Sequence, residues 1–261
     1  MIARLKTMSC GFGAFCVAAG FSAAALAADL PSTSPPPAPA APVAAAVAPL
    51  GFFVKLGLLY ANNYSTSKIF AQVPPGGGPQ FPVPNATGGI VGGDIANVVT
   101  LGFEVGYFVT PNISIDVSGG LPMYAKVTTN ALSGIGPKGT VLGQIMPAVA
   151  PVTIVYHFTQ MGAVQPYLGV GVTPAFSFAN KNGFDTGISV DPTIGLALQA
   201  GADVMFDPHW GVFVDVKKLF IQGTSHGTGI NPVPGLNLPV TSTLKSNFQP
   251  WLLSTGVAYR F

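Results

Sequence analysis

The chain has 261 residues, of which 49% are hydrophobic and only 8% are charged, whereas soluble domains usually carry about a quarter charged residues. No stretch after residue 30 offers about 18 unbroken apolar residues, which excludes a membrane-spanning helix there. Setting Arg4 and Lys6 aside from the 11 basic residues leaves nine, which balance the 9 acidic ones, so no nucleic-acid partner is expected.

The first residues have the organisation of an export signal. Arg4 and Lys6 form a positive start, an apolar core follows over residues 8–26, and an Ala-Leu-Ala box ends at Ala27. This pattern predicts a signal peptide over 1–27 that is cleaved near Ala27. The alternative is an uncleaved membrane anchor, because the apolar core is longer than that of most signal peptides.

A proline-rich segment follows over residues 28–50. Seven prolines lie between Pro31 and Pro49, separated mainly by Ala, Ser and Val. Proline fixes φ and lacks a backbone donor, so the segment favours extended polyproline II without a packed core. We expect a disordered periplasmic arm that acts as a spacer, with a docking site for a periplasmic or cell-wall partner as the alternative.

From Phe52 onward, apolar residues alternate with small or polar ones. This period of two predicts strands with one apolar face each. An apolar chain with dispersed rather than continuous hydrophobicity is typical of a barrel whose lipid-facing and lumen-facing residues alternate. We predict eight strands, over residues 52–60, 99–107, 113–118, 152–158, 167–172, 196–204, 212–217 and 253–261.

Short and long connections alternate between these strands, as in outer-membrane barrels with short periplasmic turns and long external loops. An open sheet edge in hydrocarbon would leave backbone groups unpaired, so the sheet must close. The predicted fold is therefore all-β, an eight-stranded antiparallel transmembrane β-barrel over 51–261. A secreted β-sandwich is disfavoured because the outer faces lack charges. The expected long loops are 61–95, 128–139, 181–186 and 225–242.

Aromatic residues gather near the predicted periplasmic strand ends, where a girdle at the membrane interface requires them. The chain ends on Phe261, which closes an alternating strand and is typical of barrels inserted by the barrel assembly machinery. We expect a protein of the cell outer membrane. Its expected partners are outer-membrane lipid and lipopolysaccharide, the assembly machinery through Phe261, and small hydrophobic ligands.

Several short motifs occur in a fixed order: Leu101-Gly102-Phe103, Thr110-Pro111-Asn112, Gln165-Pro166-Tyr167, Pro250-Trp251 and a closing Gly256 to Phe261. From about residue 51 to the end, this order and spacing resembles the OmpW family of eight-stranded outer-membrane barrels. The resemblance implies a narrow barrel with a hydrophobic pocket or channel open to the outside. It implies passive passage of small hydrophobic molecules, with lateral exit through the wall. Some relatives act as bacteriocin receptors. Gln249 departs from the family, which often has Asp there.

Nearly all charges within the predicted strands fall on the inward face. Isolated charges in a low-dielectric interior are costly, so these should pair with one another or with water. They form either a salt-bridge plug or a polar floor beneath a hydrophobic pocket. The channel-lining polar residues expected are Lys55, Glu104, Asp116, His157, Gln199, Asp203, Asp215, Lys217 and Arg260.

Toward the outer end, the candidate inward positions become apolar, and Met and Phe suit an adaptable pocket. The alternative for any one of them is contact with lipid or with loops. From a wider set that includes Leu142 and Ile145, the expected hydrophobic pocket consists of Leu59, Leu121, Met123, Phe176, Phe178 and Phe220.

Four prolines lie in or beside the strands, and each removes a donor from the ladder. Pro122, Pro147, Pro151 and Pro174 therefore predict bulges or local gaps in the wall. A lateral opening near such a gap is our hypothesis for how a hydrophobic ligand leaves.

No catalytic constellation emerges. Cys10 and Cys16 lie in the predicted signal peptide, and His157 and His226 lack the spaced nucleophile and acid that a hydrolase needs. We expect no enzyme activity, no cofactor and no metal. The leading function is a conduit for small hydrophobic molecules. The alternative is a structural or receptor barrel whose loops bind a ligand or bacteriocin without transport.

Overall fold

The computed structural model describes residues 51–72, 78–230 and 239–261, which all belong to the unit Pro42–Phe261. The predicted signal peptide and the Pro/Ala-rich arm lie outside the described residues. Among the helical segments of the described ranges, none is long and apolar enough to cross a membrane.

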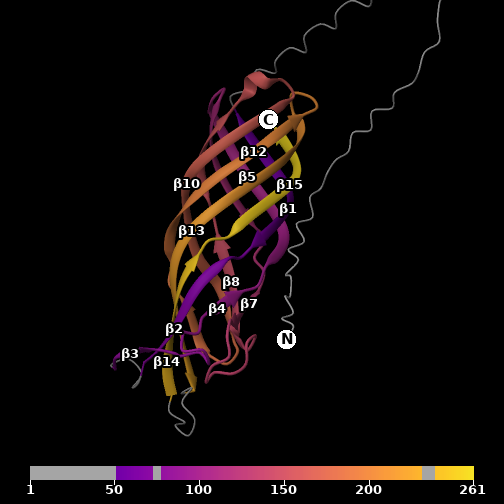
Figure 1. Ribbon diagram of the computed structural model, residues 1–261. Helices are drawn as coiled ribbons and strands as arrows, with labels where there is room; N and C mark the ends of the chain where they lie inside the picture. The colour runs from indigo at the N-terminus through magenta and orange to yellow at the C-terminus, as the bar shows by residue number, and fades with distance from the viewer. Residues whose placement is uncertain (1–50, 73–77, 231–238) are drawn as a thin grey trace, which may run out of the picture. The chain divides into compact units, whose positions relative to one another are not determined.

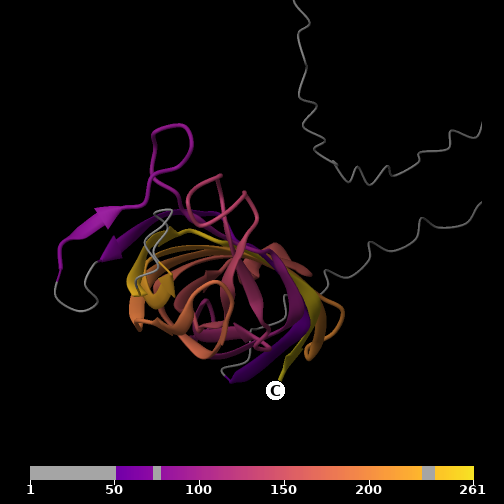
Figure 2. The same ribbon diagram turned by 90° about the horizontal axis from the view of Figure 1, so that it is seen from below.

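Eight antiparallel strands form a closed ring, which confirms the predicted fold class (Figure 1, Figure 2). Each strand pairs with the next, and the last pairs back with the first, for example through Leu56 and Val257. In ring order the strands are β1 (Phe52–Asn62), β5 (Val98–Thr110), β6 (Ile113–Gly120), β9 (Val152–His157), β10 (Val164–Asn182), β12 (Thr193–Met205), β13 (Trp210–Ile230) and β15 (Trp251–Arg260).

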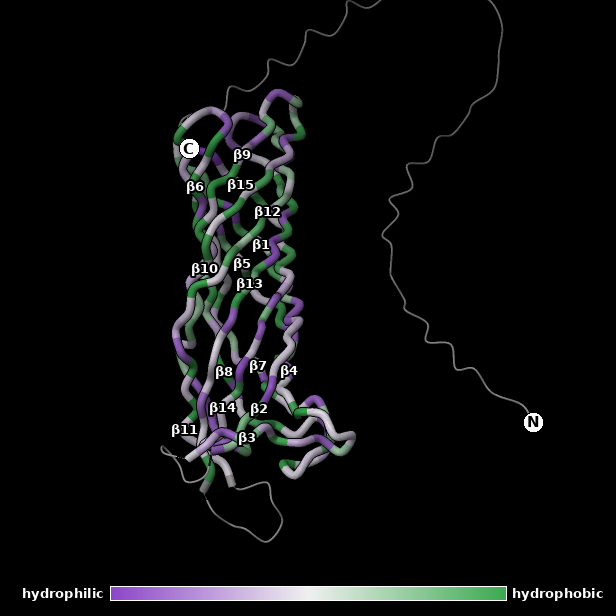
Figure 3. The backbone as a smooth tube through the Cα atoms, turned by 60° about the vertical axis from the view of Figure 1, so that its left-hand side comes forward, coloured by the Kyte–Doolittle hydropathy of each residue, from purple (hydrophilic) through white to green (hydrophobic). Residues whose placement is uncertain are grey.

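Along each strand, successive side chains point in turn to the lumen and to the exterior of the barrel. In β1, Phe53 and Lys55 are buried, whereas Leu56 and Leu58 are 59% and 58% exposed. Successive side chains of a strand point to opposite faces, so the apolar set of every strand covers the outside of the ring. Hydrophobic positions accordingly recur along the half of the barrel that carries the C-terminus (Figure 3). This exterior faces lipid.

A second tier of strands continues the wall beyond the membrane half, at the end opposite the C-terminus (Figure 1). The loops predicted over 61–95 and 225–242 are therefore wrong in large part, because both contain paired strands. Their Ser-, Thr- and Gly-rich residues complete backbone ladders whose outer face meets water. Only scattered residues, such as Ile69 and Val240, are apolar and buried, so no long apolar alternation marks these strands. This tier extends β10 and β13 with β2 (Ser65–Gln72), β3 (Gln80–Pro82), β4 (Gly93–Ile95), β7 (Ala125–Thr129), β8 (Val141–Val149), β11 (Thr186–Val190) and β14 (Pro239–Phe248).

The wall is interrupted on one side of the ring. β6 ends at Gly120 and the chain re-enters the sheet only in β7, while β8 and β9 are separated at Pro151. No ladder pair joins residues 119–124 to residues 146–150 in the described part of the wall. Pro122 and Pro151 supply no N–H, which explains the break at this level.

The other two prolines do not interrupt the sheet. Pro174 is in register with Ile194 of β12, and its carbonyl accepts the N–H of Ala150. Pro147 is in register with Ser177 of β10, and the register shifts between Ser177 and Asn180, so the predicted irregularity is a bulge here. The predicted gap is thus confined to the seam between β6 and the β8–β9 junction.

Aromatic pairs surround the end of the barrel where the turns are short. Ring centroids of Trp210 and Tyr259 lie 4.7 Å apart, and those of Tyr156 and Phe158 lie 5.0 Å apart. Short turns mark the periplasmic side, and one of them is the 3₁₀ turn η1 (Thr159–Met161). These rings occupy the place expected of the periplasmic aromatic girdle.

Candidate ligand cavity and charged floor

The inward residues of β13 show how the lumen changes along its axis. From the periplasmic side, beyond Phe213, they are Asp215 and Lys217, then Leu219 and Ile221, then Gly223. The alternation of a single strand therefore presents a charged level, an apolar level and an open level in succession. The neighbouring strands supply matching residues at each level.

Two lysines hold the charged level together. Lys217 Nζ lies 2.7 Å from Glu104 Oε2 and 2.6 Å from Asp215 Oδ1. Lys55 Nζ lies 2.9 Å from Asp203 Oδ1 and 3.3 Å from Glu104 Oε1. Buried charges need such partners because their desolvation is costly. Strands on different sides of the lumen are joined by these contacts.

Further polar contacts extend the level toward the periplasm. Arg260 Nη2 lies 3.0 Å from Asp203 Oδ2. Ser114 donates a hydrogen bond of 2.6 Å to Asp116, and its Oγ lies 3.0 Å from His157 Nε2. These residues form the lower edge of the same network.

A glutamine crosses the centre of the lumen. Gln199 Nε2 donates to Asp215 Oδ2 at 2.8 Å and to Glu104 Oε2 at 3.1 Å. Its Oε1 accepts from Thr153 at 2.6 Å, and Tyr167 donates to Asp215 at 3.0 Å. Neutral donors thus add hydrogen bonds to the carboxylates of Glu104 and Asp215.

The structure brings together all nine polar residues predicted to line the channel, and each is at most 4% exposed. These residues are also closely packed. Gly106 has no side chain, and the ring of Phe53 and the carboxylate of Asp116 occupy the space beside it. We name this layer the charged floor. It comprises Lys55, Glu104, Asp116, His157, Gln199, Asp203, Asp215, Lys217 and Arg260.

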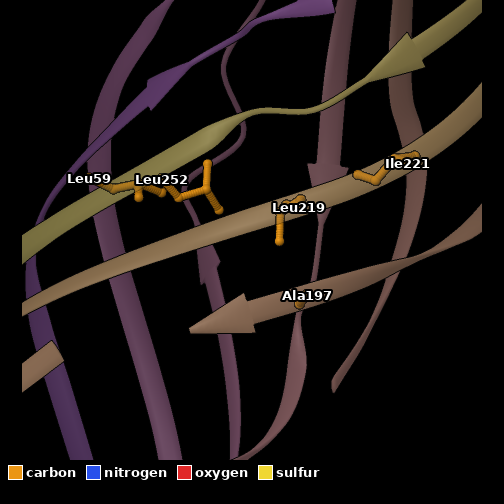
Figure 4. Packing of buried hydrophobic residues seen from close by; sticks show 5 residues of the cluster. All are labelled: Leu59, Ala197, Leu219, Ile221 and Leu252. Atoms are coloured by element: carbon orange, nitrogen blue, oxygen red, sulfur yellow. The ribbon is translucent and has the colours of Figure 1, made fainter. Parts of the chain in front are cut away.

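An apolar layer lies next to the charged floor on its outer side. Five buried side chains from strands β1, β12, β13 and β15 form it, and Figure 4 shows the strands that carry them. Burial of apolar side chains stabilises by roughly 25 cal/mol per Å² removed from water. The residues are Leu59, Ala197, Leu219, Ile221 and Leu252.

A cavity of about 120 Å³ opens above this layer, inside the second tier of strands. An apolar cavity of about 150 Å³ binds a molecule such as benzene in a well-studied case, so this one suits a small hydrophobic ligand. Its wall is mainly aliphatic, with Ile69, Val127, Leu142, Ile145, Ile221 and Leu244 among the lining residues.

Eight polar residues interrupt the apolar lining, and four of them form two contacting pairs. Ser242 donates a hydrogen bond of 2.8 Å to Asp185, and His226 Nε2 lies 3.2 Å from Asp191 Oδ2. Burial raises the pKa of Asp185 above its ordinary value, while the Ser242 hydrogen bond opposes that shift. A few polar groups on an apolar wall are typical of ligand pockets, where they orient the ligand.

A second, smaller cavity of about 30 Å³ lies lower in the lumen, beside the interruption of the wall. Leu59 and Lys217 bound it from the lumen, and Gly120, Val149 and Pro151 bound it from the interrupted strands. It therefore adjoins the charged floor, the apolar layer and the seam in the wall.

The predicted hydrophobic pocket is only partly correct in its placement. Leu59 is 8% exposed and belongs to the apolar layer, whereas Phe176 borders the upper cavity but is itself 38% exposed. The other four residues lie on the outer surface, because they continue the outward face of their strands or lie in the interrupted segment. Leu121, Met123, Phe178 and Phe220 are 52%, 47%, 60% and 39% exposed.

The residues that do line the upper cavity include several that the sequence prediction missed. Ile221 of this lining and Leu219 of the apolar layer below it continue the inward series of Asp215 and Lys217, so alternation alone would have found them. Ile69 lies in β2, within the loop predicted over 61–95, and Leu244 lies in β14, which was not predicted as a strand. Of the wider candidate set, Leu142 and Ile145 do line the cavity.

Comparisons with known proteins agree with this architecture. Residues 85–261 match the family model described as OmpW family. An uncharacterized outer-membrane protein of Sinorhizobium fredii is 33% identical over 94% of this chain and 93% of its own length. A dibenzothiophene metabolism operon protein of Pseudomonas aeruginosa is 29% identical over 51% of this chain and 62% of its own length.

Among solved structures, the outer membrane protein OprG of Pseudomonas aeruginosa superimposes with a TM-score of 0.65. The identity is 18%, and the match covers 80% of this chain and 95% of that chain. At this level of identity the likeness concerns the fold alone.

Proposed function

The chain belongs to the OmpW family and is a protein of the cell outer membrane, and on this premise we propose that it conducts small hydrophobic molecules passively inward. The observation that carries the proposal is the apolar cavity in the outer half of the lumen, closed below by the charged floor. A hydrophobic molecule finds a favourable site there, whereas hydrated ions meet a sealed layer. The cavity lies in the second tier, at the end of the barrel remote from the short periplasmic turns. The ligand therefore enters from outside the cell.

The charged floor directs the ligand sideways rather than straight through. A hydrophobic molecule would have to displace buried ion pairs to continue along the axis, and breaking a buried ion pair costs about 3–5 kcal/mol. The lower cavity offers a different way out, because Gly120, Val149 and Pro151 border both it and the interrupted wall. We infer that the ligand leaves through this seam into the membrane.

The seam suits this exit because its backbone is already unpaired across the gap. Opening it requires no ladder hydrogen bond between residues 119–124 and 146–150 to break in the described wall. Elsewhere in the ring a ligand would have to separate paired strands. One relative is named for a dibenzothiophene metabolism operon, and this apolar aromatic compound is consistent with the proposed class of ligand.

The test is the uptake of an aromatic hydrocarbon such as naphthalene by cells that lack the gene and by the same cells with the gene restored. The proposal expects uptake to fall on deletion and to recover on restoration. Unchanged uptake across several hydrophobic probes would overturn it and favour a structural or receptor barrel.

A further inference from the structure

Two lysines face each other on the outside of the second tier. Lys68 of β2 and Lys245 of β14 are directly opposite in the antiparallel register. Both are exposed, and both line a groove on the outer wall with Thr66, Gln222, Thr224 and Asn247. The groove therefore presents two ammonium groups surrounded by hydroxyl and amide groups.

This pair lacks the anion that it requires. Like charges directly opposite on neighbouring strands destabilise a sheet. In the described residues, the ion pairs involve neither Lys68 nor Lys245. Lys245 Nζ lies 5.1 Å from the ring centre of Phe70, a contact that holds the ammonium group but does not neutralise it. An external anion would relieve the repulsion.

The position of the groove along the barrel axis, measured from the apolar band, indicates which anion lies beside it. At about 3.3 Å per residue and a tilt of about 40°, the stretch of β13 from Trp210 to Phe220 spans roughly 25 Å along the axis, the height of the apolar band of such barrels. Lys218 lies near the upper limit of this band, with Nζ 4.9 Å from the Trp251 ring, as expected at an interface.

Thr224 lies opposite Lys245, so the two lysines stand roughly 10 Å above that limit by the same rise and tilt. The whole bilayer exceeds its hydrocarbon core by about 10–15 Å, which leaves roughly 5–7 Å of polar region in each leaflet. The backbone of the groove thus stands just above the polar region of the outer leaflet, and the long lysine side chains extend back to the level of the lipid phosphate groups.

We propose that the groove over β13, β14 and β2 is a binding site for the phosphate groups of lipopolysaccharide, with Lys68 and Lys245 as the charged ligands. Thr66, Thr224, Gln222 and Asn247 supply neutral donors around them. The site lies on the outer face of the wall, opposite the upper cavity, and Gly223, Thr224 and Ser246 border both. It anchors the second tier to the leaflet that surrounds it.

The test measures binding of a labelled rough lipopolysaccharide to the full chain in zwitterionic detergent. At about 1 kcal/mol per lysine near an anionic lipid surface, the double variant Lys68→Gln, Lys245→Gln should bind roughly 30-fold more weakly. The charge-conserving variant Lys68→Arg, Lys245→Arg should bind like the wild type. The matched control Lys126→Gln, Lys138→Gln removes two other lysines and should have a much smaller effect.

Chemical variants of the ligand complete the test. Dephosphorylated lipopolysaccharide should bind the wild type as weakly as the intact lipid binds the double glutamine variant. Equal loss in the control variant would show that net charge alone attracts the lipid and would overturn the site. Competition by inorganic phosphate at the same concentration as the lipid would also overturn it, because the site would then be one for free phosphate.

Discussion

Lys217 Nζ lies 2.7 Å from Glu104 Oε2, although the two residues come from strands that are not neighbours in the ring. β15 and β1 stand between β13 and β5, so the ion pair bridges the lumen rather than a strand pair. A contact of this kind closes the barrel at the level where it lies. It also makes the stability of the barrel depend on residues far apart in sequence.

Replacing Glu104 with Gln should destabilise the barrel, because Lys55 and Lys217 each lose a charged partner. Loss of one partner in a buried ion pair typically costs about 3–5 kcal/mol, which is the expected fall in the free energy of unfolding. Urea unfolding in micelles measures it. The exposed acid Asp94 provides a control, since Asp94→Asn should change stability by less than about 0.5 kcal/mol. An unaltered urea midpoint for Glu104→Gln would contradict this account of the floor.

The charged floor should also prevent steady ion flow through the wild-type barrel in planar bilayers. The double variant Glu104→Ala, Lys217→Ala removes one charge of each sign and the bridge between them, so a measurable current is expected. Asp94→Ala, Lys126→Ala makes the same change at exposed positions and should leave the barrel closed. If the lumen variant conducts no better than this control, the floor does not depend on the bridge.

Gly120 offers a way to test the lateral exit. A Cβ placed there would lie 2.7 Å from Leu59 Cδ2 and 3.0 Å from Thr100 Cγ2, both at the ends of side chains that can move. Gly120→Val should therefore fill the lower cavity and reduce uptake of a hydrophobic probe several-fold, while binding in the upper cavity persists. Ala200→Val adds the same side chain on the outward face of β12, away from the lower cavity, and serves as the control. Normal uptake by Gly120→Val would argue against this route.

Asp185 predicts a pH dependence of stability. Burial raises the pKa of this carboxyl, so the folded barrel holds the proton more tightly than the unfolded chain does. The resulting stabilisation is complete below the unfolded pKa of about 3.9 and is lost as pH rises through the raised folded value. Thermal unfolding from acid to neutral pH should show the wild type losing stability relative to Asp185→Asn. Parallel curves for the two proteins would exclude this contribution.

The membrane half of the barrel was predictable because one physical rule determines it. Lipid outside and a polar lumen inside force a period of two, so Lys55, Glu104 and Gln199 could be assigned to the inward face from the sequence. The same rule, followed further, would have placed Phe220 outside with Val214 and Leu219 inside with Lys217. The prediction instead selected large apolar residues by type, and four of its six pocket positions lie on the outer surface.

The second tier was not predictable by that rule, because its strands meet water on the outside. Lys68 and Ile69 give a recognisable alternation only once the pairing of β2 with β14 is known. The position of the seam was predictable only in part. Proline indicated where a ladder could fail, but only the tertiary pairing shows that Pro174 keeps the wall intact while Pro151 separates β8 from β9.

The upper cavity is the centre of the account, and Gly223 gives direct access to it. This glycine lines the cavity, and a Cβ added there would meet no atom within 4 Å. Gly223→Phe should therefore occupy the ligand's space without distorting the strand. The neighbouring Gln222 points outward, so Gln222→Phe adds the same ring outside the lumen.

The most direct measurement is naphthalene uptake by gene-deleted cells that carry the wild type, Gly223→Phe or Gln222→Phe at equal levels in the outer membrane. The account predicts that Gly223→Phe lowers uptake to that of the deleted cells, while Gln222→Phe matches the wild type. Full uptake through Gly223→Phe would contradict the claim that hydrophobic molecules enter by this cavity.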